Sequence, residues 1–229
     1  MAIADNLKEI KDNLNRTALG CGRDPQSIRL LPVSKRKPLE ALLEAHEAGE
    51  NLFGENRVDE ALEKLEKLPR GVQVDMIGHL QSNKAAKTAG KFRLIHSVDS
   101  LKLAARLDRA NGAIGNVQDI LIELNTSGEE SKSGYTDCES LLKDLEEMVN
   151  MKNICLKGFM TMAPFIEERD LIRRTFVRCR EWRDEAQKRF PDQDFSELSM
   201  GMSGDYVEAI EEGATIIRVG TAIFGARQY

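Results

Sequence analysis

Eight short apolar runs alternate with longer segments of helical periodicity, and this alternation limits the possible folds more than any other feature. The segments between the runs are long enough for the crossovers that parallel strands require. A count of eight favours a sheet closed into a (β/α)8 barrel, with an open doubly wound sheet as the alternative. The runs fall at 30–34, 51–53, 74–77, 94–98, 119–124, 154–159, 195–199 and 215–219.

The helical segments each carry one apolar face. Before the first run, apolar residues at helical spacing predict an extra N-terminal helix that ends near Gly20. No linker or low-complexity stretch interrupts the 229 residues, a length that suits one barrel, so we expect a single domain over 1–229. The faces consist of Leu7, Ile10, Leu14 and Ala18; of Leu141, Leu145 and Met148 within 137–149; and of Ile172, Phe176, Cys179, Trp182, Ala186 and Phe190 within 169–190.

Composition excludes several classes of protein. The net charge of −5 and the interspersed charges leave no basic surface typical of nucleic-acid binding. No apolar run approaches the roughly 20 residues of a membrane span, and the first residues lack the apolar core of a secretory signal. The four cysteines are far apart and form no C-x-x-C pair, as is usual for reduced thiols in the cytoplasm. No His, Cys, Asp or Glu residues have metal-ligand spacing.

Polar residues follow every predicted strand, where barrel enzymes carry their functional groups. Lys35 ends the first strand, so its amine is predicted to point into the barrel mouth. Burial there would lower the pKa of the amine and let it condense with an aldehyde. The alternative is that Lys35, at the end of the strand, extends into water beside Arg36 and Lys37. Judged from this residue alone, the alternative is favoured. The polar segment 125–135 is either a plain loop or the rim of a site.

The last two strand ends predict a phosphate site. The segment 199–210 passes through two glycines into a helix expected to begin at about Asp205, and a Gly-Thr pair follows the eighth strand. Loops after strands seven and eight commonly bind phosphate in such barrels. The alternative is that the Gly-Ser turn before this helix serves only to cap the helix N-terminus. The expected donors are the backbone N–H groups of Ser203, Gly204, Gly220 and Thr221, with the hydroxyls of Ser203 and Thr221.

Two further side chains have more than one interpretation. Arg218 lies within the last strand and, if buried, needs a partner. That partner is either a barrel glutamate such as Glu123 or a bound heterocycle. His79 follows the third strand and is either a base or a wall residue, whereas His46 and His96 lie within a predicted helix and strand and are expected to be structural.

The chain resembles the pyridoxal 5′-phosphate (PLP) homeostasis proteins, called YggS in bacteria, over nearly its whole length and in the same order. The segments that carry the resemblance are PVSK (32–35), FGENRV (53–58), IGHLQSNK (77–84), HSVDS (96–100), NTSGEESKSG (125–134), GFMTMAP (158–164), LSMGMSGDYVEAI (198–210) and RVGTAIFGAR (218–227).

The resemblance implies a monomeric barrel like the N-terminal domain of fold-type III PLP enzymes such as alanine racemase. It implies a Schiff base between PLP and Lys35, with Asn56 near the ring oxygen and Arg218 facing the pyridine nitrogen. It places His79 and Met160 at the walls of the ring. Ser203, Gly220 and Thr221 would bind the phosphate, with Gly204 as a further donor.

The expected function is binding and supply of PLP, with PLP-dependent apo-enzymes as possible partners and with effects on amino-acid and keto-acid balance. A weak amino-acid racemase is the alternative. Racemisation needs a second acid/base group on the opposite face of the cofactor, and after Gly225 the chain has four residues, too few for the domain that supplies it. An arginine at the pyridine nitrogen also weakens PLP as an electron sink. We therefore expect a carrier without catalytic residues.

Overall fold

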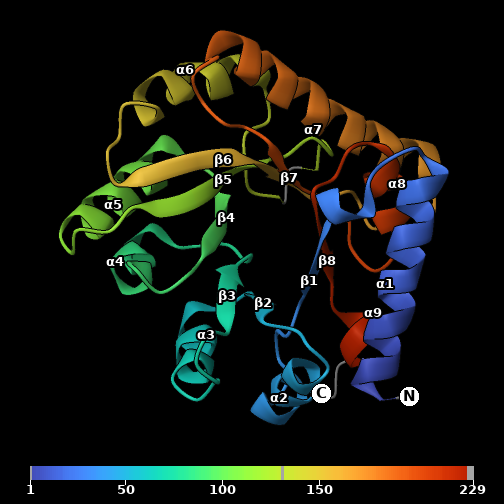
Figure 1. Ribbon diagram of the computed structural model, residues 1–229. Coiled ribbons are helices and arrows are strands. Elements are labelled where there is room, and N and C mark those ends of the chain that lie inside the picture. The colour runs from blue at the N-terminus through green and yellow to red at the C-terminus, as the bar shows by residue number, and fades with distance from the viewer. Residues whose placement is uncertain (1, 130–131, 226–229) are drawn as a thin grey trace.

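Eight parallel strands form one sheet in the computed structural model, which describes residues 2–129 and 132–225. Along the sheet the order is β1-β8-β7-β6-β5-β4-β3-β2, so adjacent strands are consecutive in sequence except for the β1–β8 pair (Figure 1). The strands are β1 (Arg29–Pro32), β2 (Leu52–Glu55), β3 (Gln73–Met76), β4 (Leu94–Val98), β5 (Gln118–Leu124), β6 (Ile154–Thr161), β7 (Glu197–Ser199) and β8 (Ile216–Val219).

The sheet closes between β1 and β2. Val33 forms an isolated parallel bridge with Gly54, and the Ser34 N–H donates to the Gly54 carbonyl at 3.0 Å. At the other edge of β1, Leu31 pairs with Arg218 of β8. These contacts complete a (β/α)8 barrel, and the predicted fold class is confirmed. The closing contacts directly precede Lys35.

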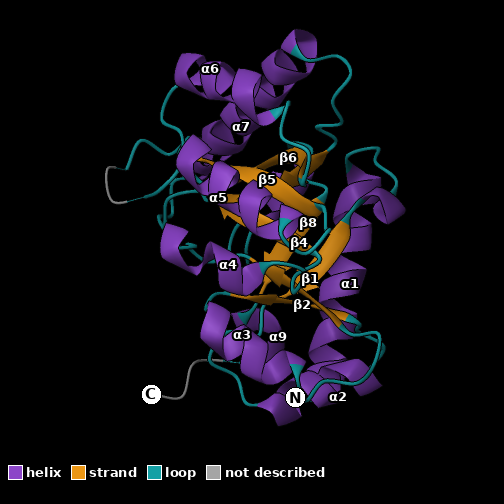
Figure 2. Ribbon diagram, turned by 90° about the vertical axis from the view of Figure 1, so that its left-hand side faces the viewer, coloured by secondary structure: helices purple, strands orange, loops and turns teal. Residues whose placement is uncertain are grey.

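Helices surround the strands (Figure 2). The predicted N-terminal helix is present and lies beside α8 and α9 (Figure 1), where the Asn6 side-chain amide donates to the Ile223 carbonyl at 2.8 Å. Within the described residues, no helix is long and apolar enough to cross a membrane. The helices are α1 (Ile3–Gly20), α2 (Leu39–Glu47), α3 (Val58–Leu65), α4 (Ala85–Thr88), α5 (Leu101–Gly112), α6 (Cys138–Met148), α7 (Arg169–Arg189), α8 (Tyr206–Glu211) and α9 (Thr221–Phe224).

The core has two apolar parts. The larger lies between the helices and the outer face of the strands, and it includes every predicted apolar face residue except Phe190, which is half-buried just after α7. The smaller fills the inside of the barrel. It contains Leu31, Leu94, Leu121, Met160 and Ile216, contributed by five different strands. Inward side chains therefore plug the barrel, and ligands are accommodated at its end.

The boundaries differ from the predictions in a few places. The seventh strand begins at Glu197 rather than at 195, because Phe195 instead packs its ring against Phe159 at 5.3 Å between centroids. β6 runs two residues further than expected, to Thr161. Residues 130–131 of the expected rim loop and 226–227 of the last family segment lie outside the described residues.

Candidate functional site

A cavity of about 930 Å³ opens at the carboxyl ends of the strands. It is lined by residues that follow β1, β2, β3, β6, β7 and β8, so segments far apart in sequence meet there. Seven of the nine predicted cofactor-binding residues line it: Lys35, Asn56, Ser203, Gly204, Arg218, Gly220 and Thr221.

A tight turn presents Lys35. The Lys37 N–H donates to the Ser34 carbonyl at 3.0 Å, so Lys35 and Arg36 are the two central residues of a β-turn. Arg36 has φ = 58°, the sole positive φ of a non-glycine residue in the described part of the chain. That conformation costs an ordinary side chain on the order of 1 kcal/mol. The turn is therefore held by contacts rather than by the preference of its own residues.

The predicted phosphate loop has the shape of an anion cradle. Gly201 has φ = 92°, and a Cβ there would come within 2.5 Å of the Ala209 Cβ, so the tight turn requires glycine. The backbone N–H groups of Ser203, Gly204 and Gly220 donate to no other described residue. Unpaired N–H groups lining a cavity suit a phosphate.

Gly204 and Asp205 complete the description of this loop. Gly204 does not adopt a positive φ, and a Cβ there would meet open space, so its backbone does not require glycine. The helix begins at Tyr206, and the Asp205 carboxylate accepts the Met202 N–H. Burial raises the pKa of Asp205, while the Met202 N–H and nearby Arg218 oppose the rise.

Arg218 crosses the floor of the cavity. Its guanidinium donates to the Ser199 carbonyl and Oγ, both at 2.6 Å, and to the Thr161 carbonyl at 2.9 Å. Burial lowers the pKa of Arg218 to about 10, partly offset by Asp205 and Glu123, and the group remains a cation at neutral pH. Glu123, one of the two partners considered for Arg218, forms no salt bridge with it among the described residues and acts on it only through its charge.

A buried polar chain supports Arg218 from within the barrel. Ser199 Oγ lies 2.9 Å from His96 Nδ1, and His96 Nε2 lies 3.2 Å from Asp75 Oδ2. Asp75 in turn accepts from Arg93 near the far end of the barrel. Burial lowers the pKa of His96, so the neutral ring accepts from Ser199 and donates to Asp75. His96 is fully buried, and two hydrogen bonds, through Ser199, connect it to Arg218 at the cavity.

Glu123 is a buried carboxyl on β5 near this series of hydrogen-bonded side chains. Its Oε2 has no hydrogen-bond partner among the described residues. The pKa of Glu123 is raised to about 7, mainly by burial and also by the nearby Asp99, with Arg218 opposing the shift. The carboxyl is therefore partly protonated near neutral pH, which lowers the cost of leaving one oxygen without a donor.

Two predicted site residues do not line the cavity as the structure has it. Met160 is 1% exposed and belongs to the apolar plug inside the barrel. His79 is exposed, with Nδ1 3.3 Å from Asp99 Oδ2 and 3.4 Å from Ser133 Oγ. The sequence did not reveal that Asp99, twenty residues later, would supply the orienting carboxylate.

Sequence reasoning missed the loop between β6 and α7. Met162, Pro164, Phe165, Ile166 and Glu167 all line the cavity, and the Phe165 side chain is fully exposed at its rim. Met162 and Pro164 fall within the matching segment 158–164, whereas residues 165–167 lie beyond it. The hydrophobic residues of the loop carried no chemical signal. Lys132 ties the loop to the 125–135 rim, because its Nζ donates to the carbonyls of Met162 and Ala163 at 3.2 and 3.0 Å.

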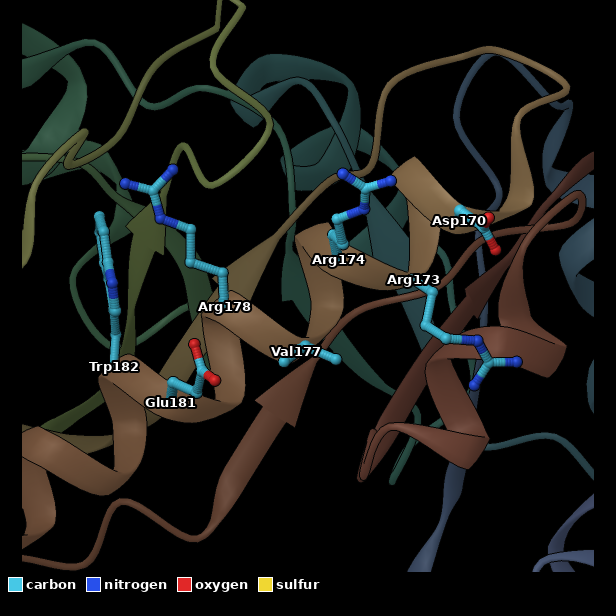
Figure 3. Close-up of a pocket in the computed structure, with 7 residues that line it drawn as sticks. All are labelled: Asp170, Arg173, Arg174, Val177, Arg178, Glu181 and Trp182. Atoms are coloured by element: carbon cyan, nitrogen blue, oxygen red, sulfur yellow. The ribbon is translucent and has the colours of Figure 1, made fainter.

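A second depression lies on the outer surface of α7 (Figure 3). All seven residues that line it belong to that one helix, and Arg178 lies over the Trp182 ring at 4.9 Å. A single helix face offers no converging groups from other elements, so the cavity at the strand ends remains the candidate site. Within the described ranges, no cluster of His, Cys, Asp and Glu residues could hold a metal ion.

Comparison with known proteins agrees with this geometry. The family described as "Alanine racemase, N-terminal domain" matches residues 5–228. The pyridoxal phosphate homeostasis protein of Vibrio alginolyticus is 38% identical over all of this chain and 99% of its own length. That of Pseudomonas aeruginosa is 40% identical over 99% of this chain and 96% of its own. The chain belongs to the pyridoxal phosphate homeostasis protein family.

Solved structures give the same family and the same fold. PipY of Synechococcus elongatus with PLP bound is 37% identical, with a TM-score of 0.84 over 97% of this chain and 100% of that one. Alanine racemase of Clostridium difficile has a TM-score of 0.76 but is 13% identical, and this chain covers 56% of it. The second likeness shows the barrel fold alone.

Proposed function

We propose that this chain binds PLP as a Schiff base on Lys35 and acts in PLP homeostasis, as a carrier or regulator of the cofactor. The observation that carries the proposal is one cavity lined by Lys35, by unpaired backbone N–H groups and by Arg218. Its family relatives bear the name PLP homeostasis protein, and PipY has a PLP-bound structure. We further propose a single domain over 1–229 that works as a cytoplasmic monomer and delivers PLP to apo-enzymes.

The residues present fit the cofactor. The N–H groups of Ser203, Gly204 and Gly220, with the hydroxyls of Ser203 and Thr221, would hold the phosphate. Arg218 would face the pyridine nitrogen as a donor that cannot lose its proton at neutral pH, and Asn56 would lie near the ring oxygen. The bound aldehyde supplies the reactive carbon. Lys35 would present its Nζ to that carbon as the amine that condenses with it.

The placement of His79 and Met160 modifies the proposed site. Met160 supports the cavity from below through the apolar plug, whereas the His79–Asp99 pair lies outside its present lining. We therefore propose that Ile77 and Met162, which do line the cavity, form the walls next to the ring. Both are half-buried side chains that pack on the plug.

The test is a spectrum followed by chemical trapping. Purified protein mixed with PLP should gain a visible absorbance band, and borohydride should then leave a pyridoxyl group on the Lys35 peptide. Lys35→Ala should lose both signals. Lys84→Ala is the matched control, because Lys84 pairs with Asp59 outside the cavity, and it should keep them. Label on Lys84 or Lys132 in the unaltered protein would show that the assignment is wrong.

A further inference from the structure

A buried lysine lies directly behind the turn that presents Lys35. The Lys64 side chain, on α3, is 9% exposed. Its Nζ donates to the Ser34 carbonyl at 2.9 Å, and to Glu55 Oε1 and Glu60 Oε1 at 2.7 Å each. An ammonium group has three N–H donors, so all three are used.

These contacts hold the backbone on both sides of Lys35. The Ser34 carbonyl, which accepts from Lys64, belongs to the peptide group before Lys35. The Arg36 N–H, in the peptide group after Lys35, donates to Glu60 Oε1 at 2.7 Å. Lys64 and Glu60 are one helical turn apart and are paired with each other. A single ion pair on α3 therefore fixes both peptide groups that set the direction of the Lys35 side chain.

The conformation of Arg36 shows why such contacts are needed. At φ = 58° an arginine lies in a region that glycine or asparagine adopts more readily. Without the bond to Glu60, the turn would relax toward conformations that direct the Lys35 side chain elsewhere. The clamp, defined as Lys64 and Glu60, thus opposes the local preference of the chain.

The clamp also reaches the neighbouring strand. Ser34 Oγ donates to Glu55 Oε1 at 2.6 Å, and Glu55 directly precedes Asn56, which lines the cavity. A buried ion pair is rarely more stabilising than apolar residues of equal volume. This ion pair instead fixes the ends of β1 and β2, which carry Lys35 and Asn56.

We propose that Lys64 and Glu60 are positioning residues for Lys35, and that they set the fraction of bound PLP that becomes covalently attached. The inference rests on the proposed function. In this role the clamp favours reaction of Lys35 Nζ with the aldehyde, with loss of water, and contributes little to holding the phosphate. Among the described residues, the hydrogen bonds of the clamp reach the cavity lining only through the backbone that it holds.

The experiment compares two ligands on the full-length protein. The affinity for PLP reflects both the contacts in the cavity and the covalent link. Pyridoxine 5′-phosphate has an alcohol in place of the aldehyde, so its affinity reflects the contacts in the cavity alone. Glu60→Ala removes the acceptor of the Arg36 N–H. It should lower the ratio of the two affinities by roughly tenfold, as expected for loss of a hydrogen bond to a charged group. The affinity for pyridoxine 5′-phosphate should stay within about twofold.

Three further variants make the result specific. Glu63→Ala, an exposed neighbour on the same helix, should leave the ratio unchanged. Glu60→Gln keeps an oxygen acceptor and should retain most of the ratio. Arg36→Gly added to Glu60→Ala should restore much of it, because glycine adopts a positive φ without the cost that arginine bears. Arg36→Gly adds no contact, so a restored ratio of affinities would not be expected if Glu60 had a purely structural role.

The outcomes distinguish failure of the clamp from failure of the proposed function. If the unaltered protein binds both ligands equally, the covalent link and the proposed function are wrong. If it prefers PLP but Glu60→Ala keeps that preference, the clamp has no positioning role. Equal loss of both ligands in Glu60→Ala would also overturn the inference, because it would show general damage to the cavity. Urea unfolding of each variant identifies that case independently.

Discussion

Arg218 Nη1 lies 2.6 Å from both the carbonyl oxygen and the hydroxyl oxygen of Ser199. Two acceptors on one residue fix the plane of the guanidinium as well as its position. Because the same hydroxyl contacts His96, the orientation of Arg218 is linked to a chain of buried groups that ends at Arg93. The cationic floor of the cavity is therefore rigid before any ligand arrives.

Replacing Arg218 should cost stability even without a ligand. Arg218→Met keeps much of the volume but leaves the Ser199 and Thr161 carbonyls without their donor, so the free energy of unfolding should fall by about 2 kcal/mol or more. Arg218→Lys retains the charge and should lose less. Urea unfolding of the ligand-free proteins measures both. Equal stability of Arg218→Met and the unaltered protein would mean that these contacts contribute nothing.

The phosphate loop should make PLP bind far better than pyridoxal. Ser203→Ala combined with Thr221→Ala removes two hydroxyl donors, each worth up to roughly 1.5–3 kcal/mol to a charged group. The backbone N–H groups remain, so binding should weaken without being abolished. Titrations followed by absorbance give the affinities. Equal affinity of the unaltered protein for PLP and pyridoxal would refute the assignment of this loop.

Glu123 should make stability fall as pH rises. Its pKa is raised from 4.5 to about 7 in the folded protein, so folding is favoured when the carboxyl is protonated. That contribution is complete below pH 4.5 and is lost as pH rises through about 7, for a total of up to about 3 kcal/mol.

Glu123→Gln isolates this contribution. The variant has no carboxyl to titrate at this position. Its free energy of unfolding should therefore increase relative to that of the unaltered protein as pH rises from 4.5 to 7. The measurement is the difference in unfolding free energy across that range, which cancels the contributions of other groups. A difference that does not change with pH would contradict the raised pKa.

His96 should remain neutral where an ordinary histidine titrates. Burial is the largest influence on its pKa, and Asp75 opposes it without reversing the direction. At pH 6.5, the ordinary pKa of histidine, the ring nitrogens should give the signals of one neutral tautomer, with the proton on Nε2. Nitrogen NMR with His96→Gln as the assignment control makes the test. A half-protonated ring at this pH would show that the proton order inferred for the buried chain is wrong.

Amino acids should exchange their α-protons little faster than they do with free PLP. Of the three histidines, His46 lies on α2, His96 is buried inside the barrel, and His79 lies outside the cavity lining. Exchange of alanine in deuterated water is the measurement, with Lys35→Ala as the control. Turnover near the ~10 s⁻¹ median of enzymes, abolished in that control, would favour a racemase instead. His79→Ala should leave the slow exchange unchanged.

The sequence predicted the barrel because its signal is periodic and repeated. Each apolar run marks a largely buried strand, and the count of eight favours closure over an open sheet. Boundaries were less certain where one residue fits two roles. Phe195 extends an apolar run yet lies outside the strand, because its ring packs on Phe159 across the core.

The site was predictable where a residue directly follows a strand. Asn56 directly follows β2, Lys35 and Thr221 come within three residues of the ends of β1 and β8, and each lines the cavity. The supporting contacts were not predictable, because they join residues through folded geometry. Nothing in the sequence relates Lys64 to Ser34, or Asp99 to His79. Met160 and His79 also follow the strand-end rule, yet one side chain points into the plug and the other outward.

The pairing of Leu31 with Arg218 has a consequence for the order of events during synthesis. The two partners are separated by most of the chain, so their loop-closure entropy is among the largest that the fold must overcome. A ribosome releases β1 early and β8 late, and the cavity needs residues that follow both. Cofactor capture should therefore coincide with completion of the barrel. A nascent chain would then hold no reactive aldehyde until it can enclose one.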